Sequence, residues 1–267
     1  ATCPSMAPPY DAVLWDMDGV LIDVSGSYRR AIQETAAAYI GKPVDVATVQ
    51  RFKDMGGYNN DWKLTAAIIS EAGVVTPYEE VVTAFQARYK GADYDGLISK
   101  EPPIIDGAKT LGALAQAGLQ LALVTGRPDD EARWSLKRFG WDGFFPVVVA
   151  MEAQEGKGKP DPFPLTKALG LLPRPVEPAR AAYIGDTGDD MIAARAAGMR
   201  AIGVVPPYLD FEAHAATLRA AGAHEVLRHP DEVVAAVLGD AGAAAGAPAA
   251  GGPPEWVARL LPEAAEG

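Results

Sequence analysis

The sequence contains few of the residues that build disulfide frameworks or transition-metal sites. Its 267 residues include one cysteine, Cys3, and three histidines. A single cysteine excludes a disulfide within the chain, and its position near the start argues against a thiol nucleophile. We therefore expect neither a disulfide-stabilised secreted domain nor a cysteine-based enzyme, and we expect a reducing compartment.

Long apolar runs and excess positive charge are also missing. No apolar run approaches the ~20 residues that a membrane-spanning helix needs. Acidic residues outnumber basic ones by 35 to 24, which gives a formal net charge of −11. Because nucleic-acid binding requires clustered lysine and arginine, we expect a soluble protein that binds neither membrane nor nucleic acid. A monomer or small homo-oligomer is expected.

The chain begins Ala-Thr-Cys-Pro, without an initiator methionine and without a signal-like or arginine-rich leader. Two interpretations stay open, a mature form from which a targeting peptide has been removed and a trimmed chain. The expected location is the cytoplasm or an organelle stroma, which includes the chloroplast if the chain is a processed form.

Five short apolar runs, rich in Val, Ile and Leu, are typical of strands buried on both faces of a parallel sheet. They are residues 12–15, 119–124, 146–150, 181–184 and 200–205. Helical patterns lie between or after them, at residues 107–117, 129–139, 163–170, 188–197 and 211–221. Strands that alternate with helices predict an α/β fold with a doubly wound, Rossmann-like parallel sheet, in which ligands bind beyond the carboxyl ends of the strands.

The residues between the first and second strands do not alternate in this way. Residues 26–40, 45–54, 60–72 and 78–90 carry apolar residues at helical spacing. We predict a small all-helical cap domain over residues 24–104, inserted between core segments 8–23 and 105–238. Residues 239–267 begin with low-complexity Ala, Gly and Pro and are predicted to be a linker and tail.

An acidic pair follows the first strand, in the segment Asp16-Met17-Asp18-Gly19. Asp16 and Asp18 are two residues apart at a strand end, so both side chains can face one cavity. One carboxylate can attack phosphorus and form an aspartyl-phosphate, and the other, when protonated, can donate to the leaving oxygen. A polar turn that closes the strand is the structural alternative.

A hydroxyl and an ammonium group follow later strands. Thr125 and Gly126 come directly after the second apolar run, where a hydroxyl and backbone N–H groups can hold phosphoryl oxygens. A helix cap is the alternative for Thr125. Lys159 follows the third run by a short loop and could neutralise charge on a phosphoryl group, whereas a lysine taken alone is usually a solvated surface residue.

Three further carboxylates, those of Asp186, Asp189 and Asp190, follow the fourth apolar run. Such a cluster repels itself unless a positive charge lies within it. Hard oxygen ligands select Mg²⁺, which binds through one or two carboxylates together with water and substrate phosphate. The cluster therefore indicates a Mg²⁺ site, with an acidic helix N-terminus as the alternative.

Taken together and in this order, the four segments resemble the motifs of the haloacid dehalogenase superfamily, over roughly residues 10–235. The position of the helical insert resembles the branch with phosphoglycolate phosphatases, β-phosphoglucomutases and sugar-bisphosphate phosphatases. Dehalogenases of the superfamily lack the second acid of the first motif, which is present here as Asp18. The resemblance therefore favours phosphoryl transfer over carbon–halogen hydrolysis.

The resemblance implies a catalytic role for four residues. Asp16 is similar to the nucleophile and Asp18 to the general acid/base. Thr125 is similar to the phosphate-binding hydroxyl of the second motif, and Lys159 to the lysine of the third.

The resemblance also implies a metal site. Asp16 is similar to a residue that is both nucleophile and metal ligand, and the backbone carbonyl of Asp18 is expected to bind the same ion. Asp186 is similar to the metal-binding acid of the fourth motif and Asp190 to its supporting acid. We assign Asp16, Asp18, Asp186 and Asp190 to a Mg²⁺ site.

The expected function is that of a Mg²⁺-dependent phosphatase. Its substrate would be a small phosphorylated metabolite, a sugar phosphate or bisphosphate such as xylulose 1,5-bisphosphate. Two alternatives stay open, a sugar phosphomutase with the same residues and a non-catalytic binding protein on the same fold.

Substrate selection is predicted in a stretch of the helical insert that is dense in hydrogen-bonding and aromatic groups. Lys53 or Arg51 could pair with a second, non-transferred phosphate, and Gly57, one of two paired glycines, permits close backbone approach to a ligand. Asn59 or Asn60 could read sugar hydroxyls beside Tyr58. A turn between two helices is the alternative.

In the core, Gly126 and Arg127 are further candidates for substrate binding. Arg127 stands beside Thr125 and could reach the substrate, or it could pair with Asp129 or Asp130.

Overall fold

The computed structural model describes residues 9–55, 58 and 60–239. The chain forms two compact units, one of residues Ile22–Pro103 and one of the residues on either side of it. We call them the helical unit and the sheet unit. No helix among the described residues is both long and apolar enough to cross a bilayer. The predicted tail, residues 239–267, lies outside the described part except for Gly239, as does Cys3.

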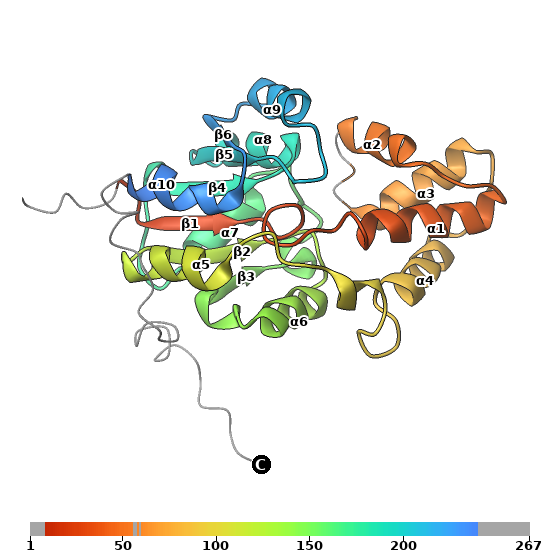
Figure 1. The fold of residues 1–267 in the computed structure, drawn as a ribbon, viewed down its shortest axis with the longest axis horizontal. Coiled ribbons are helices and arrows are strands. Elements are labelled where there is room, and N and C mark those ends of the chain that lie inside the picture. Colours follow the sequence, from red (N-terminus) through yellow and green to blue (C-terminus); the bar gives the residue numbers. More distant parts are fainter. Residues whose placement is uncertain (1–8, 56–57, 59, 240–267) are drawn as a thin grey trace, which may run out of the picture. The chain divides into compact units, whose positions relative to one another are not determined.

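The sheet unit contains one sheet of six parallel strands in the order β3-β2-β1-β4-β5-β6. The strands are β1 Ala12–Trp15, β2 Gln120–Val124, β3 Val147–Val149, β4 Ala181–Gly185, β5 Arg200–Val204 and β6 Glu225–Leu227. β1 lies between β2 and β4 (Figure 1), and Trp15 is paired with Leu123 on one side and with Ile184 on the other. Every residue of β1, β2 and β4 is buried, as expected for strands covered on both faces.

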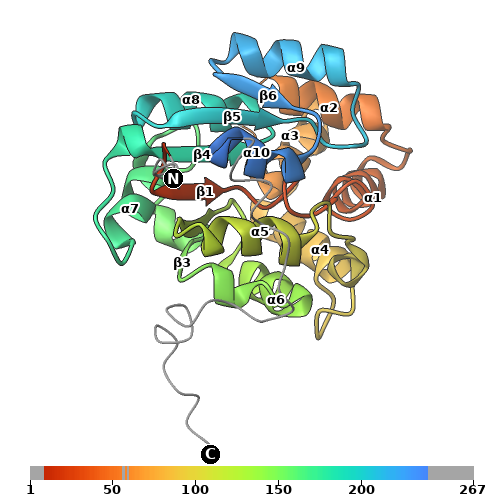
Figure 2. The same cartoon turned by 60° about the vertical axis from the view of Figure 1, so that its left-hand side comes forward.

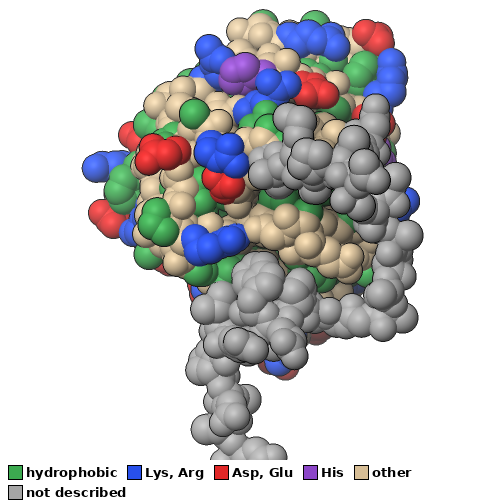
Figure 3. Space-filling model, turned by 90° about the vertical axis from the view of Figure 1, so that its left-hand side faces the viewer, with side chains coloured by type: hydrophobic (Ala, Val, Ile, Leu, Met, Phe, Trp, Pro, Cys, Tyr) green, Lys and Arg blue, Asp and Glu red, His purple; other side chains and the backbone are tan. Residues whose placement is uncertain are grey.

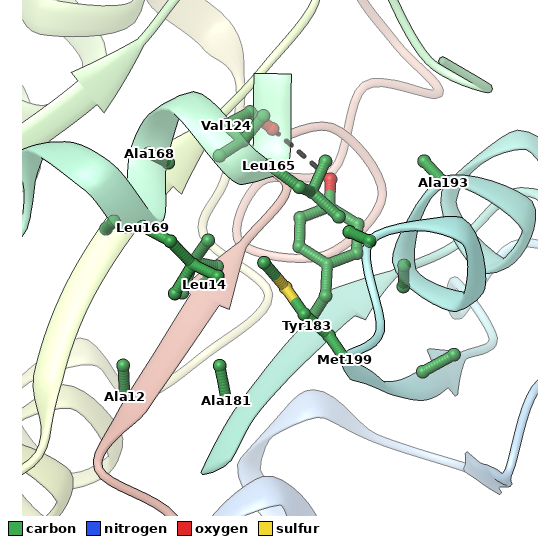
Figure 4. Close-up of a cluster of buried hydrophobic side chains, with 14 of the residues drawn as sticks. Ala12, Leu14, Val124, Leu165, Ala168, Leu169, Ala181, Tyr183, Ala193 and Met199 are labelled. Atoms are coloured by element: carbon green, nitrogen blue, oxygen red, sulfur yellow. Dashed lines mark hydrogen bonds between the residues drawn. The ribbon is translucent and has the colours of Figure 1, made fainter. Parts of the chain in front are cut away.

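Helices cover both faces of this sheet (Figures 1 and 2). They are α5 Gly107–Gln116, α6 Asp129–Phe139, α7 Phe163–Leu171, α8 Gly188–Ala196, α9 Phe211–Ala220 and α10 Val233–Leu238. α5 packs against α10, and α7 packs against α8. Under α7 and α8, a hydrophobic cluster joins Leu14 of β1 to Leu165 and Ala193 (Figure 4).

The predicted fold class is confirmed by this sheet. All five predicted strands are present, with bounds within one residue of those expected. The sequence pattern misses β6, a strand of three residues at the edge of the sheet. Its sequence, Glu-Val-Leu, is too short to show a period.

The helical unit contains α1 Tyr28–Ile40, α2 Val46–Asp54, α3 Asp61–Glu71 and α4 Tyr78–Tyr89. The side chains of Asp45 and Asn60 cap the N-termini of α2 and α3, because each accepts a hydrogen bond from a backbone N–H three residues later. The core of this unit includes the stacked rings of Tyr28 and Tyr89, whose centroids are 3.9 Å apart.

The two ends of the helical unit lie side by side. Ile22 forms an antiparallel bridge with Pro103. Nearby, the buried carboxylate of Glu101 accepts hydrogen bonds from the hydroxyls of Ser27 at 2.5 Å and Tyr89 at 3.1 Å. The chain therefore enters and leaves this unit at one place.

Charged side chains of both signs are interspersed over the face shown in Figure 3. On the sheet unit, ion pairs such as Arg180 with Asp11 and Arg200 with Glu225 join neighbouring segments. The excess of negative charge therefore does not form one acidic field on the face in Figure 3.

Candidate active site

Four of the predicted site residues lie in the segments that follow strands β1 to β4. Asp16 follows β1, Thr125 follows β2 and Asp186 follows β4, while Lys159 lies between β3 and α7. Because all the strands are parallel, their carboxyl ends meet at one edge of the sheet. The fold therefore directs the four predicted motifs toward the same edge.

Lys159 is buried between two carboxylates. Its Nζ atom lies 3.0 Å from Oδ1 of Asp16 and 2.6 Å from Oδ1 of Asp190, and all three side chains are at most 9% exposed. The ammonium group also donates to the hydroxyl of Tyr183 at 2.9 Å. Lysine is almost never buried unless it is paired, so this residue differs from the solvated surface lysine of the alternative interpretation.

Burial and charge set the protonation of this cluster. Burial raises the pKa of the Asp16 carboxyl to about 7, an effect that Lys159 opposes and that Asp190 and Asp18 increase. Burial alone would lower the pKa of Lys159, but the carboxylates of Asp16 and Asp190 outweigh it and raise the pKa well above the usual 10.5. Lys159 is therefore a permanent cation, whereas Asp16 changes its charge near neutral pH.

Both carboxylate oxygens of Asp190 are held by protein donors. Oδ1 is near Lys159 and 3.1 Å from the hydroxyl of Tyr183, while Oδ2 accepts from the backbone N–H of Thr187 at 2.9 Å and from its hydroxyl at 2.6 Å. Thr187 is the N-cap of α8 and forms a capping box with Asp190. Asp190 thus lies in the acidic first turn of α8, which was the alternative interpretation, and also contacts Lys159.

Tyr183 reaches this cluster from inside the core. It lies on β4, and its ring passes between hydrophobic side chains toward the end of β2, where the hydroxyl is 3.3 Å from the carbonyl of Val124 (Figure 4). The sequence analysis missed Tyr183 because it stands in an apolar run. It also missed Thr187, although the Thr-x-x-Asp spacing is itself the signal of a capping box.

Asp16, Asp186 and Asp190 each offer one carboxylate oxygen, and these oxygens lie within 4.8 Å of one another. Three anionic oxygen donors suit a hard divalent ion such as Mg²⁺. Both oxygens of Asp190 also accept hydrogen bonds from protein donors, and Oδ1 of Asp16 contacts Lys159. The residues present therefore fit a divalent metal.

Two glycines allow the backbone to approach these acids closely. Gly19 has a φ of +75°, and a Cβ atom there would lie 2.1 Å from Oδ2 of Asp186. A Cβ atom on Gly185 would lie 2.4 Å from that of Asp190. The ring Nε2 of His214 is 2.6 Å from the backbone carbonyl of Asp186, a supporting contact that no sequence motif indicates.

Asp18, the second acid of the first motif, pairs with Arg127. The guanidinium Nε donates to Oδ1 of Asp18 at 2.6 Å, and Nη2 lies 2.5 Å from the same oxygen. The Arg127 side chain is fully buried, whereas that of Asp18 is 28% exposed. The structure thus places Arg127 on Asp18, while Asp129, one of its two expected partners, pairs with Arg133.

Thr125 is buried and fixed through its backbone. Its N–H donates to the carbonyl of Val149 at 3.1 Å, and its carbonyl accepts from the side-chain amide of Gln154 at 2.7 Å. Its hydroxyl oxygen accepts from the N–H of Arg127 at 3.2 Å. Thr125 is not the N-cap of α6, which is Pro128, so the helix-cap alternative is wrong. Gly126, next in the chain, is half-buried.

The candidates for substrate selection belong to the helical unit. Lys53 pairs with Asp61, with Nζ 2.5 Å from Oδ1. Tyr58 packs edge-on against Phe52 at 5.4 Å between ring centroids, and Asn60 caps α3. The other two candidates, Gly57 and Asn59, lie outside the described residues. The described candidates lie in α2, at the start of α3 or between these two helices, and the selection role stays a prediction.

The family of the chain follows from comparison with known proteins. A family model described as haloacid dehalogenase-like hydrolase matches residues 10–198. The chain belongs to this family. The resemblance read from the four motifs is thereby confirmed, and with it the prediction of a hydrolase.

Several known proteins are similar to the chain. The plasmid-encoded phosphoglycolate phosphatase of Cupriavidus necator is 31% identical over 72% of this chain and 79% of its own length. A Phytophthora nicotianae protein named imidazoleglycerol-phosphate dehydratase is 37% identical over 76% of this chain, but the match spans only 45% of that protein. Among solved structures, a haloacid dehalogenase family hydrolase from Deinococcus radiodurans, with bound phosphate and sodium, is 26% identical with a TM-score of 0.66. That match covers 90% of this chain and 99% of the other.

Proposed function

We propose that this protein is a Mg²⁺-dependent phosphatase of a small phosphorylated metabolite and acts through an aspartyl-phosphate on Asp16. The observation that carries the proposal is the buried Lys159 between Asp16 and Asp190, beside carboxylates that fit a metal. Phosphatase names among the relatives support a phosphoric monoester hydrolase.

In the proposed first step, a carboxylate oxygen of Asp16 attacks phosphorus while the bond from phosphorus to the ester oxygen breaks. Asp18 gives its proton to the departing oxygen, so that an alcohol rather than an alkoxide leaves. In the second step Asp18, now a carboxylate, takes a proton from water as the water oxygen attacks phosphorus. The bond between phosphorus and Asp16 then breaks, and inorganic phosphate is released.

Charge neutralisation is assigned to Lys159, which is already directed at Asp16 and is a permanent cation. The hydroxyl of Thr125 accepts a hydrogen bond from the backbone of Arg127 and keeps its own hydrogen to donate to a phosphoryl oxygen. The N–H group of Gly126 would donate beside it.

Asp16 and Asp186 would hold the Mg²⁺ ion, together with the backbone carbonyl of Asp18, while Asp190 would support the site through Lys159. When bound, the ion supplies positive charge that offsets the carboxylates and the phosphate dianion. The ion would also keep Asp16 ionised, as a nucleophile must be. Burial raises the pKa of this carboxyl, and a cation beside it favours the charged form.

The proposed substrate is a phosphomonoester on a sugar or a small hydroxy acid. A Pseudomonas aeruginosa relative, 29% identical over 84% of this chain, is named N-acetylmuramic acid 6-phosphate phosphatase. Xylulose 1,5-bisphosphate remains within this class, although its second phosphate would compete with Asp61 for Lys53. We propose that the helical unit acts as a cap that supplies the substrate-selecting residues.

The test is release of inorganic phosphate from a panel of substrates, with Mg²⁺ and again with EDTA. The panel contains phosphoglycolate, N-acetylmuramic acid 6-phosphate, xylulose 1,5-bisphosphate and glycerol 2-phosphate. We expect release that EDTA abolishes and that Asp16→Asn removes without changing the melting temperature by more than a few degrees. Full activity of Asp16→Asn would contradict the mechanism.

Two other outcomes identify the alternatives. Isomerisation of a sugar monophosphate in the presence of a bisphosphate primer, without net phosphate release, would identify a phosphomutase. Substrate binding without release or isomerisation would identify a non-catalytic binding protein.

A further inference from the structure

Arg127 is one of the largest fully buried side chains among the described residues. A guanidinium cannot lose its charge in a protein, so burying it is unfavourable unless carboxylates and other acceptors surround it. The phosphate-binding roles assigned above do not use this side chain. Its position therefore requires a separate explanation.

The contacts of Arg127 fix the guanidinium from two directions. On one side, Nε and Nη2 both lie against Oδ1 of Asp18, at 2.6 and 2.5 Å. On the other side, Nη1 donates to the hydroxyl of Ser135, a buried residue of α6, at 3.1 Å. The planar fork of arginine can make both contacts at once, whereas lysine has a single nitrogen.

The backbone of Arg127 is fixed as well. Its N–H donates to the hydroxyl of Thr125 at 3.2 Å, and its carbonyl accepts from the N–H of Met151 at 2.9 Å. The side chain therefore extends from a rigid attachment. Asp18, in contrast, is on the loop after β1 and is partly exposed, so without a partner its carboxylate would be free to change rotamer.

We propose that Arg127 is a positioning residue that holds Asp18 by its Oδ1 oxygen, so that Oδ2 is presented to the leaving group. Ser135 braces the guanidinium from behind. This inference rests on the proposed function, in which Asp18 protonates the leaving oxygen. It assigns the arginine of the Thr-Gly-Arg segment to orientation of the acid, in place of contact with substrate.

A misplaced general acid harms some substrates more than others. Protonation matters greatly when the leaving group would be an alkoxide, as with glycerol 2-phosphate, and little for the stable phenolate of p-nitrophenyl phosphate. A residue that only maintains the fold would affect both substrates equally. The ratio of the two activities therefore separates orientation of Asp18 from general stability.

The experiment measures kcat/KM on both substrates for wild type, Asp18→Asn, Arg127→Lys and Ser135→Ala. This ratio reports the steps up to departure of the leaving group and excludes the later hydrolysis of the aspartyl-phosphate, which is the same for both substrates. General acid catalysis contributes roughly 10²–10⁴-fold, so for Arg127→Lys we expect a loss of about 10- to 100-fold with glycerol 2-phosphate. With p-nitrophenyl phosphate we expect a loss below about 3-fold, since little protonation is needed. Ser135→Ala should show the same pattern with a smaller loss. The matched control is Arg133→Lys, which changes an exposed arginine of α6. It should leave both activities unchanged.

A double variant tests whether Arg127 acts through Asp18. If it does, Arg127→Lys combined with Asp18→Asn should be no slower on glycerol 2-phosphate than Asp18→Asn alone. Additive losses would overturn the inference. Should Arg127→Lys fail to fold, as judged by circular dichroism, Ser135→Ala carries the same comparison.

The outcomes separate this inference from the proposed function. Equal losses on both substrates for Arg127→Lys and Ser135→Ala, with Asp18→Asn selective for glycerol 2-phosphate, would overturn the inference and leave the phosphatase mechanism intact. If Asp18→Asn shows no selectivity, the assignment of Asp18 fails and the inference fails with it. If wild type hydrolyses neither substrate nor any member of the panel, the proposed function itself is wrong.

Discussion

Asp16 combines two conflicting requirements in one side chain. The proposed nucleophile must be ionised, yet the carboxyl is buried and lies near the carboxylates of Asp18 and Asp190. Burial raises its pKa from 3.8 to about 7. Between these two values the folded, metal-free protein keeps a proton that the unfolded chain has lost, so the unfolded state is favoured increasingly as the pH rises.

The first prediction is therefore a loss of stability with rising pH. In EDTA, the Asp16 contribution to the free energy of unfolding should fall between about pH 4 and pH 7 and then level off. Asp16→Asn should lack this part of the fall. Urea denaturation of both proteins at several pH values makes the comparison, and parallel pH profiles for the two would contradict the raised pKa.

The second prediction concerns the hydroxyl of Tyr183. Tyr183→Phe removes an acceptor from Lys159 and a donor that Asp190 and Val124 share. We expect kcat to fall about 10-fold with little change in KM, and a loss near 1 kcal/mol in stability, typical of one hydrogen bond. Steady-state kinetics and urea denaturation give both values.

Tyr39→Phe is the control for this change, because the Tyr39 hydroxyl also donates to a backbone carbonyl, that of Glu80, but in the helical unit. It should leave kcat unchanged. An equal kcat for wild type and Tyr183→Phe would remove Tyr183 from the support of Lys159.

Among single residues, the sequence predicts those that directly follow a strand. It misses residues such as Tyr183, whose side chain enters the site from within a strand. Asp16, Thr125 and Asp186 follow apolar runs, so strand prediction alone locates them. Arg127 was noticed, but its partner Asp18 is 109 positions away in the sequence. Such a pairing depends on packing, which a local pattern does not contain.

At the scale of elements, the turn after β1 shapes the metal site. Gly19 combines a φ of +75° with a Cβ position 2.1 Å from Oδ2 of Asp186. The third prediction is that Gly19→Ala displaces the Asp186 carboxylate and weakens Mg²⁺ binding by roughly 10-fold or more, in addition to the strain of positive φ. Isothermal titration calorimetry with Mg²⁺ measures the affinity.

Gly140 provides the matched control. It has a φ of +69° at the end of α6, and a Cβ atom there would meet nothing within 4 Å. Gly140→Ala should therefore lower stability through backbone strain but leave Mg²⁺ affinity at the wild-type value. If the two variants bind Mg²⁺ equally well, contact with Asp186 is not what Gly19 avoids.

The helices and strands themselves were largely predictable because their patterns are strong. Runs such as Ala-Val-Leu-Trp of β1 and Gln-Leu-Ala-Leu-Val of β2 are buried throughout, and continuous apolar sequence predicts this kind of strand. β6 was missed because its three residues, Glu-Val-Leu, begin with a charged residue and are only partly buried, whereas β3, at the other edge of the sheet, is Val-Val-Val.

At the scale of the whole molecule, the candidate metal ligands all belong to the sheet unit. The fourth prediction is that Mg²⁺ stabilises this unit selectively, by about 2.7 kcal/mol at 100 times its dissociation constant. Hydrogen exchange should then slow in β1 and β4, with little change in α1 to α4. Asp186→Asn, which removes one ligand charge, should gain much less protection, and equal protection in that variant would place the ion elsewhere.

The central position of β1 has a consequence for the synthesis of the protein. β1 is made first, but its two neighbours begin at Gln120 and Ala181. At roughly 5–20 residues per second, the ribosome needs about ten to thirty seconds to deliver the second of them. During that interval the helical unit can fold from local contacts. The apolar strand β1, in contrast, still lacks one or both of its neighbouring strands. The nascent chain is therefore most exposed to aggregation before β4 emerges, and a chain that ends earlier would carry Asp16 directly after a strand that lacks one of its neighbours.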